Sequence, residues 1–257
     1  MFFIRLLPNI KKNKMKQYTN AIIFGIAIVA SSIFLGKAYT DRTKVEGEIQ
    51  VTGLGKADFS SDLIVWEGSF GAQNIDLKQA YLTLEKNKST VNDYLAKKGI
   101  KTEQLIYSAV KTNQKNKRIY SSNGDYIGEE FVGYELTQSV QIESKDVEKI
   151  EKVSREITEL LNQGVQFYSE SPRYYYTKLA DLKIEMISKA TEDARLRAEK
   201  ISEFSGGGLG ELESARMGIF QITGQNSKED YSWGGTFNTS SKEKTASITM
   251  KLVYKVK

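Results

Sequence analysis

The stretch KATEDARLRAEKISEFSGGGLG (residues 189–210) decides how the C-terminal half of the chain folds. It forms the second part of a long helix predicted from about Leu179 to Phe204. Three glycines at 206–208 follow this helix, and glycine just after the last helical residue is a common helix stop. The helix therefore has a sharp end, and the chain beyond it is free to form strands.

Strands are predicted on both sides of this helix. Short strands at 165–169 and 173–177 flank Pro172, and longer strands at 211–222 and 245–256 follow the helix. One face of the last strand carries Ala246, Ile248, Met250, Leu252, Tyr254 and Val256. Its other face carries Ser247, Thr249, Lys251 and Lys255. We expect the apolar face to be buried and the polar face to be exposed.

A β-β-α order is predicted at the start of the folded region. EIQVTG (48–53) and LIVWEGSFGAQ (63–73) alternate as strands. One face of the second strand carries Trp66, Gly68 and Phe70. From 76 to 98 the apolar residues repeat at helical spacing, and Gly99 is a natural stop for that helix.

The middle of the chain repeats the alternation of strands and helices. A strand at 105–113, a hairpin tip at 121–128 that contains an Asn-Gly pair, and a strand at 131–142 are predicted. A helix follows, with Ser144 as its N-cap and Gly164 as its end.

Antiparallel strands interleaved with helices, without a regular β-α-β repeat, predict an α+β fold in which helices cover antiparallel sheets. The middle segment has the order β-α-β-β-α, which is typical of a ferredoxin-like unit. We expect a basic cytoplasmic N-region (1–20), a transmembrane signal anchor (21–39), a linker (40–47), a first subdomain made of 48–128 with 209–257, and a second subdomain (129–208) inserted into it.

The net charge of +5 lies almost entirely at the N-terminus. Of the 37 basic residues, six lie in 1–37, which leaves 31 basic against 32 acidic residues in the rest of the chain. A nucleic-acid-binding surface needs clustered positive charge in the folded part. We therefore expect no nucleic-acid partner.

The chain contains neither cysteine nor histidine. This composition removes thiol and imidazole nucleophiles, the usual zinc sites, a Ser-His-Asp triad and disulfides. We expect neither enzymatic activity nor a cofactor or metal. A bacterial lipid anchor at the N-terminus needs a lipobox cysteine, so we expect attachment to a membrane to come from the polypeptide itself.

A membrane segment is indicated by AIIFGIAIVASSIFLG (21–36), which has no charge and follows the basic stretch KKNKMK (11–16). A spanning helix needs about 20 residues, and 21–39 reaches that length if Lys37 extends to the interface. Basic residues favour the cytoplasmic side, which puts residues from 40 onward outside the cytoplasm.

Other interpretations of this segment stay open. Gly36 and Ala38 are small residues at the positions that a signal peptidase reads, so the segment also fits a cleavable signal peptide. A buried core helix is a third interpretation. Met15 is an alternative start, because MKQYTNAII reads as a complete beginning of such a segment.

Three stretches together resemble the SIMPL-domain family: VTGLGKADFSSDLIVWEGSF (51–70), GVQFYSE (164–170) and the helix with its glycine turn (189–210). Residues that fall on the family pattern in the last stretch are Ala190, Asp193, Ala194, Arg197, Ala198 and Gly206. The similarity extends over most of 48–257. The long loop at 224–241 and the three-residue glycine turn depart from the pattern.

The resemblance implies a periplasmic or envelope-associated protein. Some members are immunogenic, some are linked to oxidative-stress tolerance, and one relative assembles into a ring-shaped, channel-like oligomer. The family has no established catalytic residues, so the resemblance assigns none to this chain.

Glycine motifs that resemble nucleotide sites have simpler explanations. Gly53-x-Gly55 follows a strand, but a third glycine at the required spacing and a helix are missing. The glycines at 206–210 follow a helix and precede a strand, which is the reverse of a phosphate-binding loop. We expect a turn there.

Several residues are candidates for contact with a partner: Trp233, Tyr231, Arg195, Arg197, Tyr174 and Tyr176. The aromatic pair lies in a glycine-rich loop without local packing partners. The arginines lie on the long helix, where Asp193 and Glu199 can also form ordinary i,i+4 pairs with them. The tyrosines alternate across a short strand, where ordinary sheet packing is the alternative.

We expect a membrane-anchored extracytoplasmic protein that forms a homo-oligomer and supports envelope integrity or stress tolerance. The alternative is a tethered module that binds a small envelope ligand in a cleft between the two α+β units.

Overall fold

The structure is a computed structural model that describes residues 8–43, 47–230 and 232–257. The helices are α1 (Pro8–Thr43), α2 (Leu77–Lys97), α3 (Val147–Glu156) and α4 (Leu179–Phe204), with 3-10 turns at Thr102–Gln104 and Ile157–Gln163. The strands are β1 (Glu48–Ser60), β2 (Leu63–Asn74), β3 (Leu105–Tyr107), β4 (Lys111–Tyr120), β5 (Tyr126–Ser144), β6 (Phe167–Ser169), β7 (Arg173–Tyr175), β8 (Leu209–Met217), β9 (Gln221–Gly224) and β10 (Glu243–Val256). Antiparallel sheets with covering helices confirm the predicted α+β fold.

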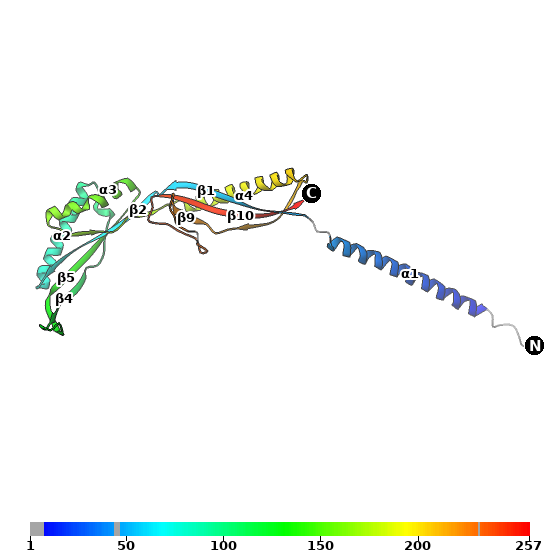
Figure 1. The fold of residues 1–257 in the computed structure, drawn as a ribbon, viewed down its shortest axis with the longest axis horizontal. Coiled ribbons are helices and arrows are strands. Elements are labelled where there is room, and N and C mark those ends of the chain that lie inside the picture. Colours follow the sequence, from blue (N-terminus) through cyan, green and yellow to red (C-terminus); the bar gives the residue numbers. More distant parts are fainter. Residues whose placement is uncertain (1–7, 44–46, 231) are drawn as a thin grey trace, which may run out of the picture.

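The sheet formed by β1, β8, β9 and β10 contains both ends of the folded region, and we call it the terminal sheet. Its longest pairing is antiparallel and runs from Glu48 opposite Lys255 to Ser60 opposite Glu243. The helix α4 lies along one face of this sheet (Figure 1). Their shared core consists mainly of Val51, Leu182, Met186, Ala190, Ala194, Ile248 and Leu252.

The contact between α4 and β1 is unusually close because both sides carry small residues. A Cβ atom added at Gly53 would lie 2.1 Å from the carbonyl oxygen of Ala190. One added at Gly55 would lie 2.2 Å from the carbonyl oxygen of Met186. The Gly-x-Gly pair of β1 therefore leaves room for the backbone of α4. This close packing explains the two glycines without a nucleotide-binding motif.

The second sheet is formed by β2–β7, and we call it the inserted sheet because it lies between β1 and α4 in sequence. Its order is β3 and β4, then β5, β2, and finally β6 and β7, all antiparallel. With α2 and α3 the order of its elements is β-α-β-β-β-α-β-β. The predicted ferredoxin-like order β-α-β-β-α lay within 129–208 and included α4, which packs on the terminal sheet instead. Trp66 and Phe70 are fully buried in its core, as the alternation of β2 predicts.

The helix ends mostly follow the predicted signals. Gly99 and Gly164 have φ angles of +78° and +76° and end their segments as predicted. The predicted N-cap Ser144 is wrong, because β5 continues to that residue. Asp146 caps α3 instead, with its carboxylate accepting the Lys149 N–H at 3.2 Å.

Three strand predictions need correction. The single strand at 105–113 is two strands, β3 and the start of β4, which are separated by residues 108–110. The single strand at 211–222 is two strands, β8 and β9, which pair with different parts of β10. Ser247 on the polar face of β10 is buried, because the loop after β9 folds back and Asn238 donates its N–H to the Ile222 carbonyl. Val256, on the apolar face, is exposed at the strand end.

The strand pairing groups the chain differently from the predicted subdomains of 48–128 with 209–257 and of 129–208. The strand β2 pairs with β5 from Ile64 opposite Ser144 to Asn74 opposite Tyr134. Residues 63–175 therefore share the inserted sheet, whereas α4 packs on the terminal sheet.

A buried lysine joins the two sheets. Lys244 at the start of β10 is 2% exposed, and its Nζ donates to the carbonyl oxygens of Tyr174 at 2.6 Å and Asn238 at 2.7 Å. Burial lowers the pKa of Lys244 to about 8. Beside it, the Asp62 carboxylate accepts from the Thr177 N–H at 2.7 Å and from the Thr177 hydroxyl at 2.6 Å. We call this contact between the two sheets, with Lys244, Asp62 and Thr177, the joint, and it is largely polar.

Gly53→Ala is expected to lower the free energy of unfolding of the full chain by about 1 to 3 kcal/mol, because the added methyl overlaps the α4 backbone. Urea unfolding followed by circular dichroism in detergent measures this loss. Gly234→Ala is the matched control, since the nearest atom to its Cβ lies 4.0 Å away. An equal loss of unfolding free energy in both variants would contradict the close packing of α4 on Gly53.

Lys244→Met is expected to remove a rise in stability with pH. The folded pKa of about 8 lies below the usual 10.5, so the unfolded chain binds a proton that the folded chain has released between these values. The free energy of unfolding should therefore rise by about 2 kcal/mol from about pH 7.5 to about pH 9.5. Lys242→Met, two residues away, should keep this slope. A slope that survives in Lys244→Met would show that another group titrates.

Candidate functional site

The N-terminal helix has the dimensions of a membrane span. Within α1, Tyr18–Thr40 comprises 23 residues, whose most apolar 18-residue stretch has a mean hydropathy of 2.1, and its side chains are exposed. Among the described residues, α1 is the one helix that is both long enough and apolar enough to cross a bilayer. A membrane anchor and a signal sequence both fit these properties.

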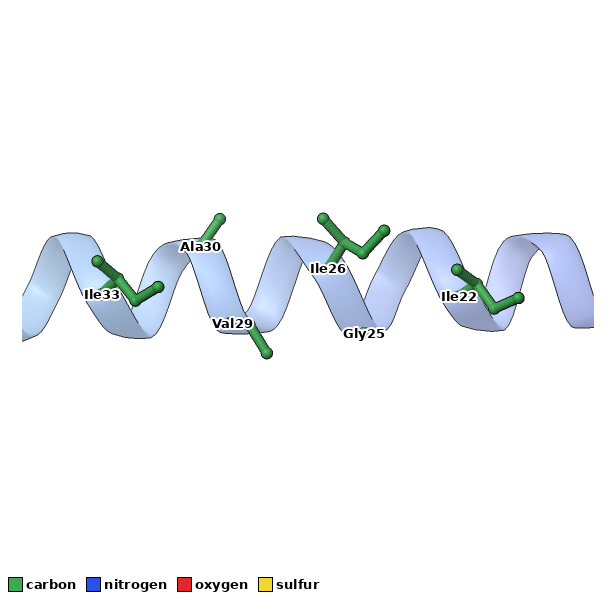
Figure 2. Close-up of a pocket in the computed structure, with 6 residues that line it drawn as sticks. All are labelled: Ile22, Gly25, Ile26, Val29, Ala30 and Ile33. Carbon is green, nitrogen blue, oxygen red and sulfur yellow. The ribbon is translucent and has the colours of Figure 1, made fainter.

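One face of α1 has a shallow hollow of about 410 Å³. Figure 2 shows its lining along the helix: Ile22, Gly25, Ile26, Val29, Ala30 and Ile33. The hollow arises because Gly25 has no side chain and Ala30 has a short one. An apolar face of this kind suits acyl chains or another helix, and it contains no group that performs chemistry.

The hairpin of β4 and β5 extends beyond the rest of the inserted sheet, and we call residues 115–133 the arm. The pairing of β5 with β2 ends at Tyr134 opposite Asn74, so β5 within the arm pairs with β4 alone in the described structure. Within the described residues, both outer edges of the arm are unpaired. Exposed apolar side chains on the arm are Ile119, Tyr120, Tyr126, Ile127, Phe131 and Val132.

Cross-strand contacts hold the arm together. The Tyr120 and Tyr126 rings meet edge to face with centroids 6.1 Å apart. Lys117 lies opposite Glu130, and the Arg118 guanidinium lies 3.9 Å from the Glu129 carboxylate. An isolated two-stranded ribbon is marginally stable in water. These contacts support the ribbon, but they leave its edges and much of its apolar surface open.

An open groove lies at the base of the arm, next to the start of α2. Its volume is about 630 Å³. It is lined by Asp76, Leu77, Lys78, Tyr81, Val110, Thr112 and Leu136. The groove lies within the inserted unit and not between the two units, where a ligand cleft was expected.

Of the two aromatic residues predicted to contact a partner from the loop between β9 and β10, the structure describes one. Trp233 is 95% exposed in the loop between β9 and β10. Tyr231 lies outside the described residues. The loop is held at its base, where the Gln221 side chain accepts the Thr236 N–H at 2.7 Å and donates to the Ser232 carbonyl at 2.8 Å.

Both predicted arginines form ion pairs within α4. Arg195 contacts Glu199 at 2.8 Å, and Arg197 contacts Asp193 at 3.0 Å. Asp193 also accepts the Leu54 N–H of β1 at 2.8 Å. This backbone bond, with Arg197, holds the pKa of Asp193 below its usual value. Arg197 thus orients the carboxylate that fastens α4 to β1.

The two predicted tyrosines lie at the joint between the sheets. Tyr174 is buried in the inserted core, and its carbonyl binds Lys244. The Tyr176 ring packs against Phe59, with centroids 4.8 Å apart. The candidate residues therefore lie in separate places, and the structure does not bring them together. The arm and Lys244 were not among them.

Metal-binding clusters are absent from the described part of the chain, where no group of three or more acidic residues is placed to hold an ion. Titratable groups with strongly shifted pKa values have structural partners. The Glu156 and Glu159 carboxylates raise the pKa of Lys98, to which they are bonded at 2.9 and 3.1 Å.

Comparison with known proteins gives a family match over nearly the whole folded region. The model of the SIMPL family, described as a protein of unknown function (DUF541), matches residues 49–254. These residues include both sheets and their helices from Ile49 to Tyr254. No curated protein is similar enough to be matched. The resemblance inferred from the sequence is confirmed, and the chain belongs to the SIMPL family.

Proposed function

We propose that this protein is a non-enzymatic, membrane-tethered, extracytoplasmic protein that self-associates through its arm and supports envelope integrity or stress tolerance. The observation that carries this proposal is the arm, whose unpaired edges and exposed apolar side chains provide a surface for another strand. Unpaired strand edges are templates for pairing with another chain.

The tether is supported by the order of charge and hydropathy along the N-terminus. Lys11, Lys12, Lys14 and Lys16 precede the apolar span, and by the positive-inside rule this order favours a cytoplasmic N-terminus. The folded region then lies on the other side of the membrane, in the periplasm of a cell that has one.

The arm lies far from the tethered end. Figure 1 shows the start of β1 and the C-terminus at one end of the two-sheet region and the hairpin of β4 and β5 at the opposite end. The 13 residues of β1 alone extend about 40 Å at about 3.3 Å per residue. An arm held away from the bilayer is accessible to other copies of the chain.

A second copy is the partner that the charges of the arm favour. The β4 side carries Lys115, Lys117 and Arg118, whereas the β5 side carries Glu129 and Glu130. Pairing β4 of one copy with β5 of another puts opposite charges side by side, whereas pairing two β4 edges opposes like charges. Such head-to-tail contacts close into a ring or continue as a filament.

A non-catalytic role is supported by the chemistry of the chain. Histidine and cysteine are missing from the sequence. Lys244, whose lowered pKa would suit a reactive amine, is buried and bonded to two backbone carbonyls. It therefore has a structural task and no access to a substrate.

Membrane fractionation and N-terminal sequencing of the protein from cells test whether α1 stays in the chain as a membrane anchor or is cleaved as a signal peptide. We expect the chain to stay with the membrane after a carbonate wash, because the span is long enough to cross it. Ile26→Lys with Val29→Lys should release it, since charges at the centre of a span are costly. A soluble chain that begins at Tyr39 would instead show cleavage after Ala38.

Self-association is tested by light scattering of the full chain in detergent. We expect a defined mass several times the 29.0 kDa of one chain. Ile127→Glu should weaken association at least about tenfold by placing a charge in an apolar interface. Ile184→Glu on α4 is the matched control, because the two isoleucines are 63% and 66% exposed. A monomeric wild type, or equal effects of both variants, would contradict the proposal.

The envelope role is tested in cells that lack the protein. We expect reduced tolerance of oxidant and detergent, restored by the wild-type chain and by Ile184→Glu but not by Ile127→Glu. Normal tolerance without the protein would argue against this role while leaving self-association intact.

The groove at the base of the arm favours one alternative, a tethered module that binds a small envelope ligand. Its mixed apolar and polar lining and its volume of about 630 Å³ fall in the range of small-molecule sites, about 300–1,000 Å³. Ligand-dependent thermal stabilisation of a monomer would favour this alternative over assembly.

A further inference from the structure

Two cations face each other on the outer side of the terminal sheet. Lys251 of β10 lies directly opposite Arg216 of β8, and Thr52 of β1 lies opposite Lys251 on its other side. This face is turned away from α4, so both charged side chains are exposed. Like charges directly opposite each other in antiparallel strands are destabilising.

Neither cation has a carboxylate partner in the described part of the chain. Arg216 and Lys251 take part in none of its ion pairs, whereas Lys115 on the arm is paired with Glu135 at 3.1 Å. Glu48, on the same face of β1, lies opposite Lys255. The repulsion between Lys251 and Arg216 is therefore left without a neutralising group from the protein.

The pair borders a small hollow of about 120 Å³. Its lining consists of Gln50, Ser214, Arg216, Lys251 and Val253, contributed by β1, β8 and β10. The guanidinium, ammonium, hydroxyl and amide groups all have N–H or O–H bonds to donate. No carboxylate contributes to the lining, so the donor set matches an anion.

We propose that this hollow binds the phosphate group of an anionic ligand between Arg216 and Lys251. Arginine binds phosphate through a planar fork, and lysine adds a compact positive charge. Inorganic phosphate carries close to two negative charges near neutral pH and offsets both cations, whereas the phosphodiester of a lipid headgroup carries one and offsets part of their repulsion. The volume fits one such group and excludes the body of a nucleotide, which must lie outside.

The hollow lies near the tethered end of the folded region. Gln50 is the third residue of β1, and the apolar span of α1 ends at Thr40. The intervening chain can extend at most about 35 Å. A lipid headgroup and free phosphate are thus both within reach, and they share the chemistry that the hollow recognises.

Calorimetric unfolding of the full chain in phosphatidylcholine discs tests this site with inorganic phosphate, against chloride at equal ionic strength. Phosphate at tenfold its dissociation constant should raise the transition temperature by about 3 to 6 °C. Arg216→Gln and Lys251→Gln should abolish the shift. In chloride each should unfold about 1 to 3 °C above the wild type, because the repulsion is relieved.

Lys56→Gln is the matched control, since Lys56 lies on the same face of β1 outside the hollow. It should keep the phosphate shift. Equal shifts in Arg216→Gln and the wild type, or an equal shift with acetate, would overturn the site. Phosphatidylglycerol discs distinguish the sources: a shift lost there identifies a lipid headgroup, and a shift kept there identifies free phosphate. Either result is independent of self-association through the arm.

Discussion

The contact between α4 and β1 is the constraint on which the rest of the structure depends. Gly53 and Gly55 let the helix backbone approach the strand, and Asp193 fixes the register by accepting the Leu54 N–H. Because the inserted sheet lies between β1 and α4 in sequence, this contact returns the chain to the terminal sheet before β8. The two ends of the folded region are thereby held in one sheet, whereas the direction of the arm depends on the contacts between the two sheets.

Local patterns predicted most elements of this fold but not their partners. Period-2 alternation identified the buried face of β2 with Trp66 and Phe70, and Gly99 and Gly164 identified helix ends. Alternation shows which face of a strand is buried, yet it does not show which strand lies beside it. The pairing of β2 with β5 is non-local, so the predicted division into subdomains did not match the strand pairing.

The candidate sites also depend on strand partners that local sequence patterns do not identify. A lysine within a polar stretch such as SSKEK is expected to be exposed, and Lys244 is buried because the carbonyls that bind it come from residues 70 and 6 positions away. The arm exists because β2 stops pairing at Asn74 while β4 and β5 continue. The opposition of Arg216 and Lys251 likewise depends on the register of β8 with β10. These features follow from tertiary pairing.

The joint determines the angle between the terminal sheet and the inserted sheet, which carries the arm. It is built from Lys244, the Asp62 bonds to Thr177 and the ion pair of Lys242 with Glu148, in addition to the packing of Phe59 on Tyr176. Hydrogen bonds are directional, so a polar joint fixes the angle between the sheets more than an apolar one of equal size. The arm thus has a set direction relative to the end of the folded region that follows α1, which the proposed head-to-tail assembly requires.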